Sequence, residues 1–151
     1  MKQSTNFILA LLVCATTASS LPQERELKKS AVPKAVLDAF AKAYPNAKAN
    51  EFSTETENGK TMYEIESTDG KTKRDITFTA DGTLMATEET IASKDLPEAV
   101  RASLKKDFEK ATITRCEKIT EGASTMYEVA MKSGKKKSEI VFNADGSVKK
   151  K

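Results

Sequence analysis

Two stretches of the chain carry apolar residues at helical spacing, and each stretch follows a proline. The two apolar stripes are Val36, Phe40 and Tyr44, and Val100, Leu104 and Phe108. Pro33 and Pro97 suit the first turn of a helix, where the missing N–H would have no partner. Asp95 and Glu98 have the spacing of a capping box, whose side chains bind backbone N–H groups at a helix start. We predict a helix after each proline, the second with this cap.

Beyond each helix the pattern changes to a period of two. Tyr63 and Ile65 alternate with more polar neighbours, and so do Tyr127 and Val129. This alternation is typical of antiparallel strands with one buried face. Two further pairs of inward residues are Ile76 with Phe78 and Ile140 with Phe142. Glycine turns between strands are predicted at Asp69-Gly70, Ser133-Gly134, Asp81-Gly82 and Asp145-Gly146. Residues 47–57 and 111–121 are also predicted strands, but their pattern does not define an inward face.

The two halves of the chain are copies of each other. Residues 32–87 align with residues 96–151 without a gap, and 19 of the 56 aligned positions are identical. A unit of this size buries too little surface to be stable alone, so we expect the two copies to share one sheet. The predicted fold is α+β, with two αββββ repeats, an antiparallel sheet and one helix per repeat packed on one face.

The segments outside the repeats have their own interpretation. Residues 1–20 read as a signal peptide, because Lys2 precedes an apolar run at residues 7–15 and small residues lead to a cleavage site near Ser20. The bulky Val13 before Cys14 disfavours a lipoprotein. We expect a flexible N-terminus at 21–31, the first repeat at 32–87, a linker at 88–95 and the second repeat at 96–151. The protein is then periplasmic or secreted.

Composition removes most catalytic chemistry. The chain has no histidine, which excludes Ser-His-Asp and Cys-His sites. Once the leader is removed Cys116 is the one cysteine left, so neither an intramolecular disulfide nor a cysteine metal cluster can form. Its alignment with Phe52 favours a small buried hydrophobe, with an intermolecular disulfide or reactive thiol as the alternative. We predict that the protein is not an enzyme and has no catalytic, cofactor-binding or metal-binding residues.

The paired carboxylates have structural explanations. Glu64 and Glu66 point to the solvated face of a strand, and Asp81 and Asp145 precede turn glycines, where aspartate hydrogen-bonds its local backbone. A calcium ion needs six or more converging oxygens. The sequence does not show such a set, so a weak calcium site at the turns is only an alternative.

Charge is unevenly distributed between the repeats. Residues 32–87 carry 7 basic and 9 acidic side chains, and residues 96–151 carry 13 and 8. A solvated surface is the favoured explanation, with steering of a partner as the alternative. The lysines at 135–137 have no interleaved aromatics for base stacking, so we expect no nucleic-acid binding. A hairpin tip that discourages edge pairing is favoured over contact with an acidic partner or a membrane surface.

The face of the sheet away from the helices is the candidate binding surface. Tyr63 and Tyr127 are predicted core residues on which the helices pack, which leaves their neighbours outward. The predicted surface residues are Met62, Glu64, Glu66, Thr77, Met126, Glu128 and Val141. Methionine adapts to different contacts, and duplication doubles the width of this face. We hypothesise that the face binds another protein.

The order of motifs in each repeat resembles the PepSY-like domains. A proline-led helix precedes a Tyr-Glu-Val/Ile strand, a glycine turn, an apolar strand and Asp-Gly, as in the beta-lactamase-inhibitor-like, PepSY-like group of exported bacterial proteins. The residues that carry the resemblance are Pro33, Val36, Tyr63, Glu64, Ile65, Ile76, Phe78, Asp81, Gly82, Pro97, Val100, Tyr127, Glu128, Val129, Ile140, Phe142, Asp145 and Gly146. The resemblance covers essentially everything after residue 31.

This resemblance implies a tandem helix-on-sheet fold like that of the β-lactamase inhibitory protein. It also implies a periplasmic or surface protein without enzyme activity, and it carries over no catalytic residues. The chain lacks the disulfides of the inhibitory protein, so inhibition of β-lactamase itself is not expected. PepSY domains are associated with restraint of peptidases, which implies a partner that is a peptidase or another hydrolase.

We therefore expect an exported binding module with a protein partner, no nucleic acid, no cofactor and no stable membrane span. The alternative is an envelope structural or stress protein without a discrete partner. These two hypotheses differ in whether a stoichiometric partner exists.

Overall fold

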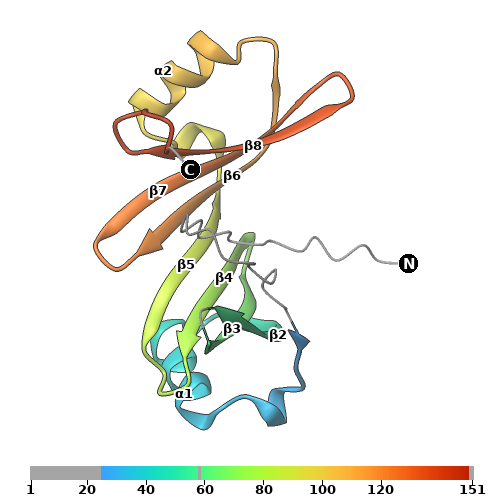
Figure 1. The fold of residues 1–151 in the computed structure, drawn as a ribbon, viewed down its shortest axis with the longest axis vertical. Helices are drawn as coiled ribbons and strands as arrows, with labels where there is room; N and C mark the ends of the chain where they lie inside the picture. Colours follow the sequence, from blue (N-terminus) through green and yellow to red (C-terminus); the bar gives the residue numbers. More distant parts are fainter. Residues whose placement is uncertain (1–24, 58, 150–151) are drawn as a thin grey trace.

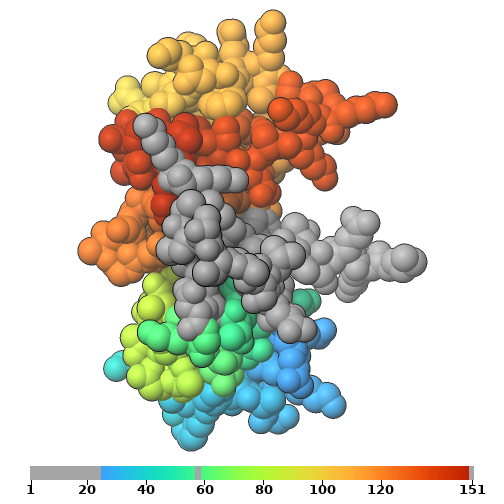
Figure 2. Space-filling view, in the orientation of Figure 1, coloured from blue at the N-terminus to red at the C-terminus, as the bar shows by residue number. Residues whose placement is uncertain are grey.

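The computed structural model describes residues 25–57 and 59–149. In chain order the elements are β1 (Arg25–Glu26), the 3-10 helix η1 (Lys29–Ala31), α1 (Lys34–Ala43), β2 (Lys48–Glu57), β3 (Lys60–Asp69), β4 (Thr72–Thr79), β5 (Leu84–Ile91), the 3-10 helix η2 (Ser93–Asp95), α2 (Glu98–Asp107), β6 (Thr112–Glu121), β7 (Ser124–Ser133) and β8 (Lys136–Asn143). The strands form one eight-stranded antiparallel sheet whose order follows the chain. The sheet is strongly twisted, and α1 and α2 lie near its two ends (Figure 1). Figure 2 shows the two repeats as the two ends of an elongated molecule.

Both helices cover the same face of the sheet, as the sequence predicted. The Tyr44 hydroxyl at the end of α1 is hydrogen-bonded to the hydroxyl of Thr87 on β5, at 3.1 Å. Ile91, four residues further along β5, packs against the core beneath α2. Because alternate residues of a strand share a face, Thr87 and Ile91 mark one face for both helices. No helix of the described ranges, 25–57 and 59–149, therefore lies on the other face of the sheet.

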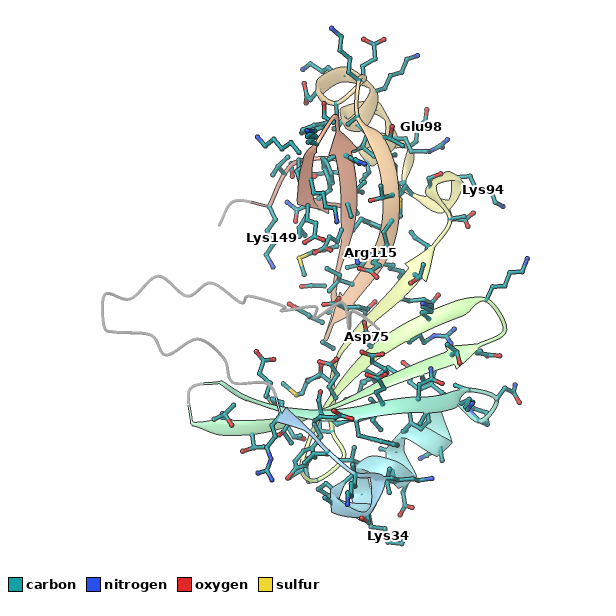
Figure 3. All side chains as sticks on the ribbon, turned by 90° about the vertical axis from the view of Figure 1, so that its right-hand side faces the viewer. Lys34, Asp75, Lys94, Glu98, Arg115 and Lys149 are labelled. Atoms are coloured by element: carbon teal, nitrogen blue, oxygen red, sulfur yellow. The ribbon has the colours of Figure 1, made fainter. Side chains whose placement is uncertain are left out.

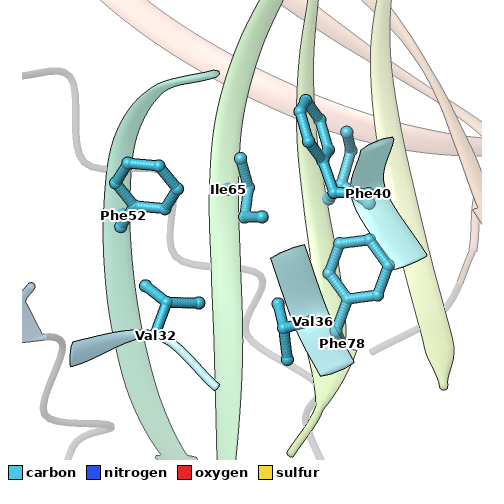
Figure 4. Packing of buried hydrophobic residues seen from close by; sticks show 7 residues of the cluster. Val32, Val36, Phe40, Phe52, Ile65 and Phe78 are labelled. Carbon is cyan, nitrogen blue, oxygen red and sulfur yellow. The ribbon is translucent and has the colours of Figure 1, made fainter. Parts of the chain in front are cut away.

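Each helix packs its apolar stripe on its own half of the sheet. Under α1, Val36 and Phe40 pack with Phe52, Ile65 and Phe78 (Figure 4). These side chains are at most 9% exposed, and each buried aliphatic or aromatic side chain contributes about 1.5–3 kcal/mol.

The core under α2 has the equivalent composition. Val100 and Leu104 pack with Cys116, Val129 and Phe142. Cys116 is 3% exposed, which confirms its prediction as a small buried hydrophobe. The two repeated tyrosines, Tyr63 and Tyr127, pack against the two cores from partly buried positions, also as predicted.

The repeat differs in detail from the predicted αββββ unit. In the first repeat β5 pairs with β4, whereas among the described residues of the second repeat the corresponding pairing is a bridge between Phe142 and Val148. At its other edge β5 pairs with β6. In this pairing Glu89 and Thr90 of β5 are equivalent to Arg25 and Glu26 of β1, which pair with β2 in the first repeat. The structure thus repeats as strand, 3-10 helix, helix and three strands, and β5 also completes the first repeat.

The N-terminal segment is more ordered than expected. In place of a flexible stretch, residues 25–31 form β1 and η1, because the Leu27 N–H donates to the Phe52 carbonyl at 2.7 Å and Leu27 packs on the first core. Residues 88–95, expected as a linker, contain the end of β5 and η2. The expected signal peptide at 1–20 lies outside the described residues.

The predicted capping box of the second helix is wrong. Pro97 is the N-cap residue of α2 and makes no side-chain hydrogen bond, and Asp95 belongs to η2. The chain passes through the 3-10 turn and then enters α2 at Pro97. Asp95 therefore lies too far before the helix to act as its cap. Pro33 has the same role before α1.

Two β-bulges explain why the sequence did not define an inward face for β2 and β6. The register with the next strand shifts between Ala49 and Glu51 in β2, and between Ile113 and Arg115 in β6. A bulge inserts one extra residue and so breaks the period of two. After the bulge in β6, Arg115 lies on the sheet face away from the helices.

Candidate functional site

The sheet face away from the helices, here called the open face, carries a row of carboxylates across four strands. Glu51 on β2 lies opposite Glu66 on β3, Glu66 lies opposite Asp75 on β4, and Asp75 lies opposite Glu88 on β5. Directly opposed like charges destabilise a sheet. This row is therefore a feature that the fold maintains against electrostatic repulsion.

The second repeat places a cation among its carboxylates. The Arg115 guanidinium lies 3.0 Å from Glu117, 3.0 Å from Glu128 and 3.2 Å from Glu139. Glu117 is 5% exposed, yet its Oε2 forms the ion pair with Arg115 without a hydrogen bond of good geometry. Asp75 and Arg115 both lie in the middle of the molecule, between its two halves (Figure 3).

The central carboxyls hold their protons to unusually high pH. Burial, followed by the charges of Glu117, Glu128 and Asp75, raises the pKa of Glu88 to about 8, although Arg115 opposes the shift. Burial likewise raises the pKa of Glu117 to about 7. Burial and the charge of Glu139 raise the pKa of Glu128, against the hydrogen bond from Arg115. Part of this cluster therefore changes charge near neutral pH.

All seven residues predicted for the binding surface lie on the open face. Thr77 is paired with Glu64, Val141 with Glu128, and Met126 with Ile119. Ile119 in turn lies opposite Glu88 of β5, in the strand pair that joins the two repeats. The exposure differs from a simple solvated face, since Met126 is 6% exposed and the others are half-buried. The predicted residues are Met62, Glu64, Glu66, Thr77, Met126, Glu128 and Val141.

Sequence reasoning missed the residues at the centre of this face. Glu88 was placed in a linker, and Glu117 and Arg115 lie on the strand whose alternation the bulge interrupts. From the bulge onward Arg115, Glu117 and Ile119 follow a period of two, and this pattern could have placed them together on one face of the strand. Asp75 could have been found as the outward neighbour of Ile76.

The turn aspartates have the structural role that the sequence predicted. Asp81 accepts hydrogen bonds from the Thr79 hydroxyl and, at 3.1 Å, from the Thr83 N–H. Asp145 accepts from the N–H and the hydroxyl of Ser147 at 2.9 and 2.6 Å. These bonds lower the pKa of both carboxyls, first through the side-chain hydroxyls.

The carboxylates that do converge belong to the open face. One oxygen from each of Glu64, Glu66 and Asp75 lies within 4.8 Å of the other two. Glu64 and Glu66 are alternate residues of β3, and Asp75 faces Glu66 across the strand pair. Such a set offers oxygen ligands to a metal ion or to the ammonium and guanidinium groups of a partner.

A groove of about 450 Å³ lies on the helix side of the second repeat. Its lining includes Leu104 and Phe108 of α2 and Ile113 and Met131 of the strands, together with the cation Arg101. The groove involves one repeat, whereas the open face joins both.

Comparison with known proteins identifies relatives of this chain. The sequence matches the family described as "Putative beta-lactamase-inhibitor-like, PepSY-like" over residues 22–86 and 61–150. A search of curated proteins found no match. The comparisons indicate no enzyme family. Among the described residues, neither helix has the length and apolar character needed to cross a membrane.

Solved structures share the fold. A BLIP-like protein from Bacteroides fragilis NCTC 9343 is 24% identical, with a TM-score of 0.62 over 78% of this chain and 84% of that one. A protein from Bacteroides eggerthii DSM 20697, described as a putative periplasmic protein, is 16% identical, with a TM-score of 0.67 over 78% and 85%. A DUF2874 family protein from Bacteroides uniformis ATCC 8492 is 14% identical, with a TM-score of 0.65 over 77% and 85%.

The family match covers nearly the whole described chain, so this protein belongs to the beta-lactamase-inhibitor-like, PepSY-like family.

Proposed function

We propose that this protein is an exported, non-enzymatic module that binds another protein through its open face. The observation that carries the proposal is the arrangement of the sheet. Both helices cover one face, and the other runs without interruption from β2 to β8 with charged and apolar side chains from both repeats. The periplasm is the proposed location, supported by the descriptions of structural neighbours and the expected leader sequence.

The open face is large enough for a specific complex. The seven strands from β2 to β8, spaced about 4.8 Å apart, give a width of about 29 Å, and eight residues of strand span about 27 Å. The resulting area of about 800 Å² is similar to the roughly 800 Å² that each partner buries in a standard interface.

The charge of the face indicates the chemistry of its partner. Glu64, Glu66, Asp75 and Glu88 place carboxylates on the first repeat's half, and Arg115 is shared among three more on the second. A partner segment with lysine or arginine would form charge-assisted hydrogen bonds here. Met62 and Val141 add apolar contact area.

A finer proposal is that the partner is a peptidase or another hydrolase, which the module inhibits. Support comes from the family description and from the BLIP-like structural neighbour. The alternative is an envelope structural or stress protein without a discrete partner. The charged and partly buried centre of the open face favours binding, because a buried polar cluster has a cost that a passive surface does not need.

Crosslinking in the native envelope tests the proposal. Thr77→Lys and Val141→Lys each add a bulky cation to the open face, one in each repeat, without removing an ion pair. We expect the double variant to lose about tenfold or more of a stoichiometric crosslinked partner in the periplasmic fraction, because a basic partner is repelled. The matched control Ala102→Lys adds the same charge on exposed α2 and should retain the wild-type yield.

The outcomes separate the hypotheses. Equal crosslinking by the open-face variant and the control, with both folded by circular dichroism, would contradict binding through this face. Absence of any stoichiometric partner would favour the structural alternative. If a partner is found, its hydrolytic activity with and without added module decides whether binding inhibits it.

A further inference from the structure

The groove on the helix side of the second repeat has an apolar floor. Its volume is about 450 Å³, within the range of small-molecule sites, and its lining includes Leu104, Phe108, Ile113 and Met131. These side chains come from α2, the turn after it, β6 and β7. Ile113 is 38% exposed and Phe108 is half-buried, so the floor presents apolar area to solvent.

Three cations also line this groove. Lys94 precedes α2, and Arg101 and Lys105 occupy exposed positions of the helix, while Glu109 adds one carboxylate. Arg101 and Lys105 are four residues apart, which places them one turn apart on the same side of α2. An anionic group held between them would accept charge-assisted hydrogen bonds.

The groove positions differ between the repeats in two ways, with cations gained on the helix side and apolar side chains gained on the strands. The pairs, first repeat before second, are Ser30 and Lys94, Leu37 and Arg101, Ala41 and Lys105, Ala49 and Ile113, and Ser67 and Met131. Lys29 is replaced by Ser93, which lowers the gain by one charge. Leu37 packs against the first core, and Phe40 stands where the second repeat has the smaller Leu104. Packing of a helix on this sheet therefore needs none of the three cations.

We propose that the groove binds a single-chain fatty acid, with its carboxylate between Arg101 and Lys105 and its methylene chain along the apolar floor. A methylene chain needs no hydrogen-bond partner, whereas a peptide on the same floor would bury backbone N–H and C=O groups against apolar side chains. The groove lies on the helix side of the sheet, away from the open face. The site therefore stands or falls independently of the proposed function.

Calorimetric titration with sodium dodecanoate tests the site. We expect one saturable site per chain with a dissociation constant of about 10⁻³ M or tighter, the value that a typical binding free energy per non-hydrogen atom gives for a ligand of this size. Octanoate should bind at least about tenfold more weakly, because it buries fewer methylenes. Dodecyltrimethylammonium, which has the same tail and the opposite charge, should also bind at least about tenfold more weakly.

Variants at exposed positions separate the groove from general charge effects. Arg101→Gln with Lys105→Gln should weaken dodecanoate binding by about tenfold or more, because both cations beside the carboxylate are lost. The matched control is Lys106→Gln with Lys110→Gln, which removes the same charge from exposed positions outside the groove and should change the affinity by less than about twofold.

A third variant fills the groove with side chains of the first repeat. Arg101→Leu with Leu104→Phe should abolish saturable binding, and if this variant folds poorly the two glutamine pairs decide the test. The proposal is overturned if the wild-type protein shows no saturable binding at about 10 mM dodecanoate, ten times the weakest expected constant. Equal weakening by the control pair, or binding to phosphatidylglycerol vesicles without binding to free dodecanoate, would overturn it as well.

Discussion

At the scale of single residues, Glu88 links the charge of the open face to the stability of the fold. Its folded-state pKa of about 8 exceeds the ordinary value of 4.5, because of burial and the carboxylates around it. Between these values the folded protein binds a proton that the unfolded chain releases. The contribution of this group to stability is therefore fully present at and below about pH 4.5, and it is lost as the pH rises to about 8.

The variant Glu88→Gln should remove this pH dependence. In EDTA at pH 8 we expect its free energy of unfolding to exceed that of the wild-type protein by about 2–4 kcal/mol, because a shift of one pKa unit corresponds to about 1.4 kcal/mol. At pH 4.5 the two proteins should be nearly equal. Urea denaturation at several pH values measures the difference, with Glu98→Gln on exposed α2 as the control. A variant less stable than the wild-type protein at pH 8 would refute the account.

The residues of the site show where sequence reasoning ends. Met62, Glu64 and Glu128 could be placed on the open face because they flank a regular alternation. Glu88 and Glu117 could not, since their burial depends on strands that meet only in three dimensions. The pKa shifts arise from those neighbours and have no local signature in the chain.

At the scale of elements, a glycine turn fixes each helix on the sheet. Gly82 follows β4 with a φ of +85°, and a Cβ placed there would lie 2.6 Å from the carbonyl oxygen of Ala35 in α1. Gly146 repeats this contact with Ala99 of α2, at a φ of +83°. The Asp-Gly sequence thus both turns the chain and allows the helix to approach.

Gly82→Ala should be more damaging than an equivalent change in an open turn. We expect a loss of about 2–4 kcal/mol, because the added methyl meets backbone and the left-handed conformation is strained. Gly70→Ala is the matched control, since Gly70 has a φ of +61° with nothing within 4 Å, and it should lose about 1 kcal/mol. Thermal and chemical denaturation of both variants give the comparison. Equal losses would mean that contact with α1 has no effect.

The elements also differ in how well the sequence predicted them. The two helices and the regular hairpins follow from strong periodicity and glycine turns, and the structure has them. β1 was missed because two residues are too few for a pattern, and they form a strand only through pairing with β2. The cap at Asp95 was wrong because Asp95 is the last residue of the 3-10 turn η2, and so short a turn has no period to reveal it.

At the scale of the whole molecule, the shared strand β5 should make unfolding cooperative. It pairs with β4 of the first repeat and β6 of the second, so neither core can open without exposing its edges. Val36→Ala and Val100→Ala, each at a fully buried position under one helix, should lower the same single calorimetric transition, each by about 1–3 kcal/mol. Two transitions, each sensitive to one variant, would show that the repeats unfold separately.

The double role of β5 also decides where this molecule can be divided. A cut at the sequence boundary near residue 87 would fall inside a strand and strip the neighbouring sheet of its hydrogen-bond partner. The turn between β4 and β5 interrupts no strand, and the segment from β1 to β4 matches the one from β5 to β8. The natural module for chimaeras or for added copies is therefore this strand-first segment, whose junctions would reproduce a pairing that the chain already uses.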